Sequence, residues 1–159
     1  MNTACKAVIT LILFVFIAGY ANAQAKNAIG LGPAFSTSAE NPTGFGIVFQ
    51  GEIKLDKRFS IVPSLGVEVP YVVYAGLAGR YYVAPRFYVH LGGFIRAGGD
   101  TFSDSGPGGT AGLGYMLLST KRNVIDLNFH ADILSSENKS RAVGGIRIVY
   151  SFSFTRLDK

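Results

Sequence analysis

The chain has 159 residues, a formal net charge of +5, one cysteine, no tryptophan, 20 glycines, 8 tyrosines and 12 phenylalanines. The single cysteine is Cys5, so the chain beyond it contains no thiol and can form no disulfide. The basic residues form no stripe interleaved with aromatic residues, which argues against nucleic-acid binding. After Gly19 no segment is apolar for long enough to be a spanning helix. Frequent glycine and aromatic residues instead favour an all-β protein.

The first residues have the order of a secretory signal peptide. Lys6 supplies a positive charge, residues 7–19 are apolar, and the Ala-Asn-Ala stretch at 21–23 is a small-residue cleavage site. A transmembrane anchor needs about 20 apolar residues, and this run is shorter. We therefore expect residues 1–23 to be a cleaved signal peptide and residues 24–159 to form a single exported domain.

Residues 44–69 show the pattern that recurs along the chain. Apolar and polar side chains alternate from 44 to 55, a charged break follows at 56–58, and the alternation then resumes. A period of two over about ten residues on each side of a tight turn is typical of a β-hairpin with one apolar face. Strands of this length cross a membrane of roughly 30 Å when tilted. The same pattern predicts eight strands, at residues 28–36, 44–55, 59–69, 72–83, 87–97, 110–119, 124–134 and 142–154.

The predicted connections alternate in kind. After every second strand the connection is a tight turn, whereas the others carry Ser, Thr, Asn, Gly or Pro and are mostly longer. Short turns at one rim and longer loops at the other are typical of outer-membrane barrels. Pro33 and Pro63 fall inside predicted strands, where a proline implies a bulge or a local distortion. The tight turns are at 56–58, 84–86 and 121–123, and the loops are at 37–43, 70–71, 98–109 and 135–141.

Charged residues within the strands fall on the polar face. Because a charge facing lipid at mid-depth costs about 2–4 kcal/mol, we expect the apolar face to meet lipid and the polar face to line the lumen. A soluble lipocalin-like barrel would have the opposite arrangement, with an apolar interior. Side chains just fill an eight-stranded barrel, and charges enclosed there must be paired.

These observations predict an all-β fold, an eight-stranded antiparallel up-and-down transmembrane β-barrel with a plugged polar lumen. The predicted lumen network consists of Glu52, Lys54, Glu68, Arg80, His90, Arg96, Asp126, His130, Asp132 and Arg147.

The last predicted strand carries a family resemblance. Tyr150, Phe152 and Phe154 resemble the terminal aromatic signature of bacterial outer-membrane proteins, which the barrel-assembly machinery recognises. Together with the signal peptide and the eight strands, this makes residues 24–159 similar to the small eight-stranded outer-membrane β-barrel family, which includes protein-X-like and W-like barrels and the porin-family outer-membrane β-barrel domain. The resemblance implies the bacterial outer membrane as location, with its lipids and the assembly machinery as partners. We expect a monomer.

Some barrels of this size are lipid A deacylases or acyltransferases. Such a site needs a serine activated by a histidine and a carboxylate. His130 and Asp132 share one strand face, but Asp132 occupies the place where the serine would be expected. We therefore assign both residues to the lumen network and predict no catalytic residue.

His90 and His130 lack the close spacing of metal ligands, so we also predict no metal and no cofactor. The predicted role is structural or surface-interacting and non-enzymatic. A narrow channel for small solutes and, less favoured, a lipid A-modifying enzyme are the alternatives.

Overall fold

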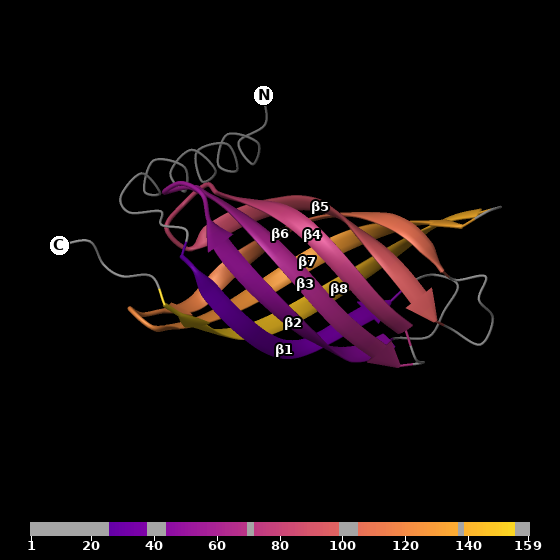
Figure 1. The fold of residues 1–159 in the computed structure, drawn as a ribbon, viewed down its shortest axis with the longest axis horizontal. Coiled ribbons are helices and arrows are strands. Elements are labelled where there is room, and N and C mark those ends of the chain that lie inside the picture. Colours follow the sequence, from indigo (N-terminus) through magenta and orange to yellow (C-terminus); the bar gives the residue numbers. More distant parts are fainter. Residues whose placement is uncertain (1–25, 38–43, 70–71, 99–104, 137–138, 155–159) are drawn as a thin grey trace, which may run out of the picture.

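Eight antiparallel strands form a closed barrel in which each strand pairs with its neighbours in the chain and β8 pairs with β1 (Figure 1). The structure is a computed structural model and describes residues 26–37, 44–69, 72–98, 105–136 and 139–154. The strands are β1 (Ala28–Thr37), β2 (Gly44–Lys54), β3 (Phe59–Val69), β4 (Val72–Tyr82), β5 (Phe87–Gly98), β6 (Gly106–Ser119), β7 (Asn123–Ser136) and β8 (Lys139–Ser153).

The predicted fold class is confirmed. In the described part of the chain, no helix is long and apolar enough to cross a membrane. The predicted signal peptide at 1–23 lies outside the described residues and stays a prediction.

Two polar connections are shorter than the sequence predicted. β6 begins at Gly106 and not at residue 110, while Ser136 at the end of β7 pairs with Lys139 at the start of β8. The backbone ladder needs only N–H and C=O groups, so it continues past the point where apolar alternation ends. The predicted loops were therefore wrong at these ends. Other parts of the predicted loops, 38–43, 70–71, 99–104 and 137–138, lie outside the described residues.

The two ends of the barrel differ. The turns at 55–58, 83–86 and 120–122 lie at one end, at the left in Figure 1, and we call it the tight-turn end. The opposite end is the loop end. At the tight-turn end Lys26 donates hydrogen bonds from Nζ to the Ser119 hydroxyl at 3.0 Å and to the Thr120 carbonyl at 2.8 Å. Burial lowers the pKa of Lys26, and the charge of nearby Glu52 opposes this shift.

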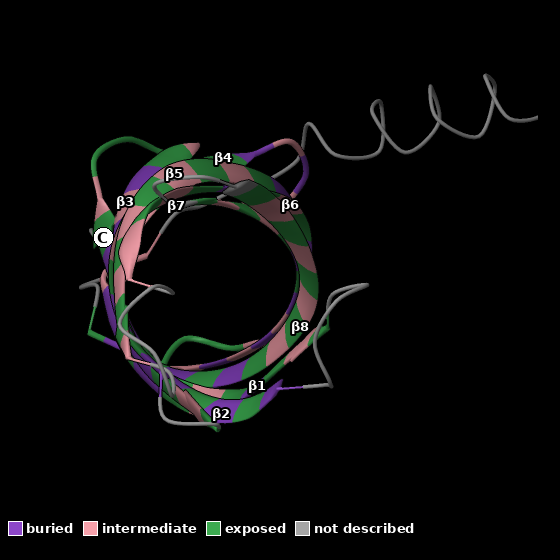
Figure 2. Cartoon of the chain, turned by 90° about the vertical axis from the view of Figure 1, so that its right-hand side faces the viewer, coloured by how far each residue is buried: buried purple, intermediate pink, exposed green. Residues whose placement is uncertain are grey.

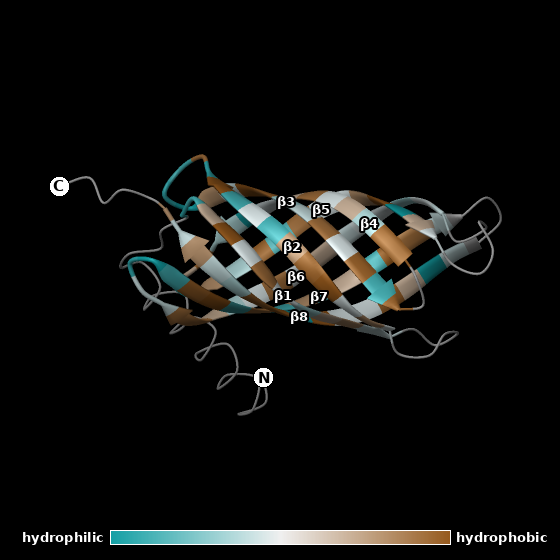
Figure 3. Cartoon of the chain, turned by 60° about the horizontal axis from the view of Figure 1, so that its bottom comes forward, coloured by the Kyte–Doolittle hydropathy of each residue, from teal (hydrophilic) through white to brown (hydrophobic). Residues whose placement is uncertain are grey.

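The outward face of the barrel is apolar. Most large apolar side chains on this face are exposed, from 39 % at Ile146 to 71 % at Leu91, while a few such as Ile61 and Ile125 are half-buried. Figure 2 shows exposed and buried residues alternating along the strands, and Figure 3 shows hydrophobic residues distributed along the wall of the barrel. An exposed apolar surface of this extent indicates contact with a nonpolar medium.

Pro33 and Pro63, the two prolines expected inside strands, interrupt pairing without changing its register. Between β1 and β8 the pairing lapses at Pro33 and resumes with the same offset, and it does so again at Pro63 between β2 and β3. Proline has no N–H to donate, so the ladder loses a bond on that side. Of the two predicted outcomes, the structure therefore has local distortion and no bulge at these prolines. The register shift between β6 and β7 lies instead between Met116 and Leu118, where the consecutive residues Leu117 and Leu118 are both exposed.

Candidate functional site in the lumen

A buried ion-pair cluster lies inside the lumen toward the tight-turn end. Arg80 on β4 lies 2.9 Å from the Oε2 atom of Glu52 on β2 and 3.4 Å from the Oδ2 atom of Asp126 on β7. The exposed fractions of the three side chains are 4 %, 9 % and 2 %. The guanidinium also lies 3.9 Å from the centre of the Tyr88 ring. One buried cation is thus held by two carboxylates and an aromatic face.

Neutral donors also bind these carboxylates. Tyr82 and Ser60 donate to the Oε1 atom of Glu52 at 2.6 and 2.8 Å, and Gln50 donates to Asp126 at 3.4 Å. Tyr82 and Tyr88 also pack with Met116 and Val124 in a buried apolar cluster. We call this whole assembly the floor; it consists of Gln50, Glu52, Ser60, Arg80, Tyr82, Tyr88, Met116, Val124 and Asp126.

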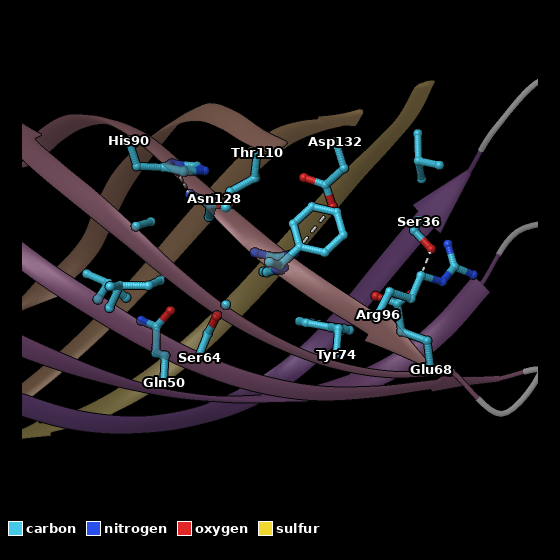
Figure 4. Close-up of a pocket in the computed structure, with 18 of the residues that line it drawn as sticks. Ser36, Gln50, Ser64, Glu68, Tyr74, His90, Arg96, Thr110, Asn128 and Asp132 are labelled. Atoms are coloured by element: carbon cyan, nitrogen blue, oxygen red, sulfur yellow. Dashed lines mark hydrogen bonds and ion pairs between the residues drawn. The ribbon is translucent and has the colours of Figure 1, made fainter. Parts of the chain in front are cut away.

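A second group of charges lies nearer the loop end. The Oδ2 atom of Asp132 on β7 lies 3.7 Å from both the His130 ring and the Arg147 guanidinium. That guanidinium is also 5.4 Å from the centre of the Tyr74 ring. Glu68 accepts a hydrogen bond from the Ser36 hydroxyl at 2.8 Å, and Figure 4 shows this pair beside Arg96 at one end of the group.

The structure divides the predicted lumen residues into sets. Glu52, Arg80 and Asp126 meet in the floor; His130, Asp132 and Arg147 meet above it; Glu68 binds Ser36; and His90 lies 3.1 Å from the Asn128 amide. Lys54 and Arg96 are on the inward face, but within the described ranges neither makes an ion pair within 4.0 Å. Among the described residues no group of three or more His, Cys, Asp or Glu side chains is placed to hold a metal ion.

Uncharged members of the lumen were missed. The prediction named only charged residues and histidines, whereas Gln50, Ser60, Tyr82, Tyr88 and Asn128 also bind within the network. The period-two pattern was the available signal, because it places all five on the inward face. The lumen also holds an apolar layer, which the prediction of a polar interior did not include: Ala34, Val48, Tyr74 and Val149, with Phe94 packed against them.

Large lumen rings lie over glycines on the adjacent strand. Each ring is directly paired with its glycine across the ladder, and a Cβ atom on that glycine would collide with the ring. Eight strands enclose little space, so a ring fits where the wall of the barrel lacks a side chain. The pairs are Tyr74 with Gly66, Tyr88 with Gly114 and Phe94 with Gly108.

We expect Gly114→Ala to lower the free energy of unfolding by about 1–3 kcal/mol, the usual cost of overpacking a core. Tyr88 is fully buried in the floor and cannot swing away from the added methyl group. Gly109→Ala on the same strand is the matched control, since its Cβ would find no heavy atom closer than 3.9 Å. Urea unfolding of both variants in phospholipid vesicles measures the difference. Equal stability of the two variants would show that the ring does not need this glycine.

A cavity of about 60 Å³ lies between the floor and the loop end. At about 10–15 Å³ per water, it holds on the order of four to six water molecules. Arg80, Gln50 and Asn128 bound it toward the floor, while Figure 4 shows Glu68 and Arg96 at its other end. Sequence reasoning placed these side chains on one face but did not predict the cavity.

The residues of the predicted assembly signal all point outward. The exposed fractions of Tyr150, Phe152 and Phe154 are 52 %, 49 % and 56 %. The Tyr150 hydroxyl donates to the Asn123 side chain at 3.0 Å. Recognition by the assembly machinery stays a prediction.

Neither a protein-family model nor a curated protein matches this chain. Solved structures do match its fold. The N-terminal β-barrel domain of Pseudomonas aeruginosa OprF has a TM-score of 0.52 at 16 % identity, with 81 % of this chain and 100 % of that chain covered. Neisserial surface protein A, NspA, has a TM-score of 0.54 at 13 % identity, with coverages of 80 % and 95 %. Ail, the attachment invasion locus protein of Yersinia pestis, has a TM-score of 0.51 at 11 % identity, with coverages of 82 % and 99 %.

These three structures are small eight-stranded outer-membrane β-barrels. Identities this low establish a common fold only. The chain therefore has the architecture of a small outer-membrane barrel.

Proposed function

We propose that this chain is a monomeric, non-enzymatic protein of the bacterial outer membrane, with a plugged lumen and a structural or surface-interaction role. The floor is the observation that carries the proposal. Its charged members are at most 9 % exposed and extend inward from β2, β4 and β7, which supports a lumen that is blocked at this level. Such a barrel acts through its lipid-facing wall and its rims.

The outward face supports the proposed location. Its apolar side chains would be solvated by lipid tails, and outer-membrane lipids are therefore the first proposed partner. The aromatic residues at the end of β8 would serve as the signal for the barrel-assembly machinery, the second proposed partner. The finer placement with protein-X-like, W-like and porin-family barrels rests on the sequence resemblance.

Two measurements on the same purified protein test this proposal. We expect the protein to fractionate with the outer membrane and to migrate differently on a gel with and without boiling, because a closed barrel resists detergent until it is heated. We expect no stepwise conductance in planar bilayers, because the floor blocks ion passage. A soluble protein without a heat-dependent shift would contradict the barrel assignment, whereas steady channel openings would contradict the plug.

A narrow channel is the second candidate, and the cavity favours it. The loop-end half of the lumen already has space, so a solute would need to displace only the floor. Conductance or solute uptake in reconstituted vesicles would support this candidate.

A lipid A-modifying enzyme is the third candidate. It would use His130 and Asp132, and His130→Ala would abolish its activity. Within the described residues no serine hydroxyl is hydrogen-bonded to His130, and we therefore keep the enzyme below the other two.

A further inference from the structure

Among the described residues, arginine donors that line the cavity have no acceptor. Within the described ranges, Arg96 makes no ion pair, and its buried Nε atom has no hydrogen-bond partner. The Nε atom of Arg147 is also buried without a partner, although the same guanidinium lies 3.7 Å from Asp132. Both side chains line the cavity. Buried guanidinium donors normally have acceptors, so these donors are satisfied either by water in the cavity or by an electron-rich ligand that replaces it.

The carboxylates that line the cavity do not supply that group. Glu68 accepts a hydrogen bond from Ser36 at 2.8 Å, and the Oδ2 atom of Asp132 is shared between Arg147 and His130. A cation would leave the free donors of Arg96 unsatisfied and would be repelled by its positive charge. An anion would pair with that charge and accept from the donors.

Asp132 adds a requirement for a donor on the ligand. Its Oδ1 atom is buried, it belongs to a side chain that lines the cavity, and the Thr110 hydroxyl on the paired strand is the one neutral donor beside this carboxylate among the described residues. Figure 4 shows the Asp132 carboxylate directed into the cavity from β7. A ligand that presents acceptors to the arginines and one hydroxyl proton to Asp132 therefore matches this lining better than one that presents acceptors alone. Fully deprotonated anions such as sulfate meet only the first condition.

We propose that this cavity binds a small oxyanion that retains a hydroxyl proton, of the hydrogen phosphate class, with Arg96 and Arg147 as donors and Asp132 as the acceptor. The volume of about 60 Å³ suits an anion of that size. The floor blocks the tight-turn end, so the anion enters from the loop end. This site is independent of any partner that the rims of the barrel recognise.

Calorimetric titration of the full, detergent-folded protein with inorganic phosphate or sulfate at equal ionic strength and neutral pH tests the site. Phosphate should bind at least about tenfold more tightly than sulfate, the difference expected from one charged hydrogen bond. Arg96→Gln should weaken phosphate binding by about tenfold or more. Asp132→Asn should remove most of the preference for phosphate, because an amide can donate to an oxyanion as well as accept from it.

Arg86→Ala is the matched control, because it removes one positive charge at the exposed tight-turn end. Its phosphate affinity should equal that of the unmodified protein. Equal binding of phosphate and sulfate to the unmodified protein would overturn the proposal. Equal losses of phosphate affinity in Arg96→Gln and Arg86→Ala would also overturn it. If Arg96→Gln does not fold, the phosphate-to-sulfate comparison on the unmodified protein decides the outcome, together with Arg96→Lys. The lysine variant should bind phosphate more weakly, since it keeps the charge without the planar fork.

Discussion

Arg80→Ala is expected to lower the free energy of unfolding by about 3–5 kcal/mol, the cost of removing one partner from a buried ion pair. The variant would leave Glu52 and Asp126 enclosed in the floor without the cation that lies 2.9 and 3.4 Å from them. It would also remove the guanidinium packed 3.9 Å from the Tyr88 ring. Urea unfolding in phospholipid vesicles, monitored by the gel shift between unboiled and boiled protein, measures the loss.

Two further variants separate charge imbalance from lost packing. A triple variant, Arg80→Met with Glu52→Gln and Asp126→Asn, removes all three charges and should be more stable than Arg80→Ala alone, since no uncompensated charge remains. Arg86→Ala, at an exposed position, should change stability little. If Arg80→Ala were as stable as Arg86→Ala, the floor would not depend on its central cation.

The fold and the assignment of faces could be predicted because both follow from local alternation. A residue's side in a strand depends on whether its position is odd or even, and a lipid-facing charge is too costly to tolerate. Ile47 and Leu65 accordingly lie on the exposed face, while Glu52 and Arg80 lie inside. The strand ends at Gly106 and Lys139 were not predictable in this way, because backbone pairing there continues through residues without apolar alternation.

Contacts within the lumen could not be predicted, because they depend on the tilt of the strands and on the height of each side chain in the barrel, as well as on the face of the strand that carries it. Arg80 and Asp126 come from the non-adjacent strands β4 and β7 and lie 46 positions apart in the chain, yet they meet across the lumen. Lys54 lies on the same face as Glu52 and only two positions away, but it is not part of the cluster. Alternation sorts side chains into two faces and contains no information about their height in the barrel.

The cavity was unpredictable for a related reason. Tyr74 lies against the wall at Gly66, and this placement determines how much of the lumen the ring fills. A glycine in a strand pattern indicates close approach or a bulge but does not identify the side chain that approaches. The register Gly66↔Tyr74 identifies it, and register becomes known only with the barrel.

Leu77→Arg is expected to destabilise the barrel in phospholipid vesicles by about 2–4 kcal/mol, the cost of an arginine facing lipid near the membrane midplane. Leu77 lies at the centre of β4 and is 57 % exposed on the outward face. Leu55→Arg is the matched control, because Leu55 is 56 % exposed but lies in the turn after β2. Near the interface the same substitution should cost only about 0–1 kcal/mol.

The comparison of these two variants tests whether a membrane surrounds the barrel, and not only whether the barrel folds. In water both arginines would be solvated equally. Substitution at two positions of equal exposure would then change the free energy of unfolding by equal, small amounts. Only a nonpolar layer centred on the strands makes the cost of an arginine depend on its depth. A difference between Leu77→Arg and Leu55→Arg in the urea midpoint in vesicles would therefore show that lipid surrounds β4. Equal stabilities would mean that the apolar face meets something other than a bilayer, such as a protein partner or a second barrel.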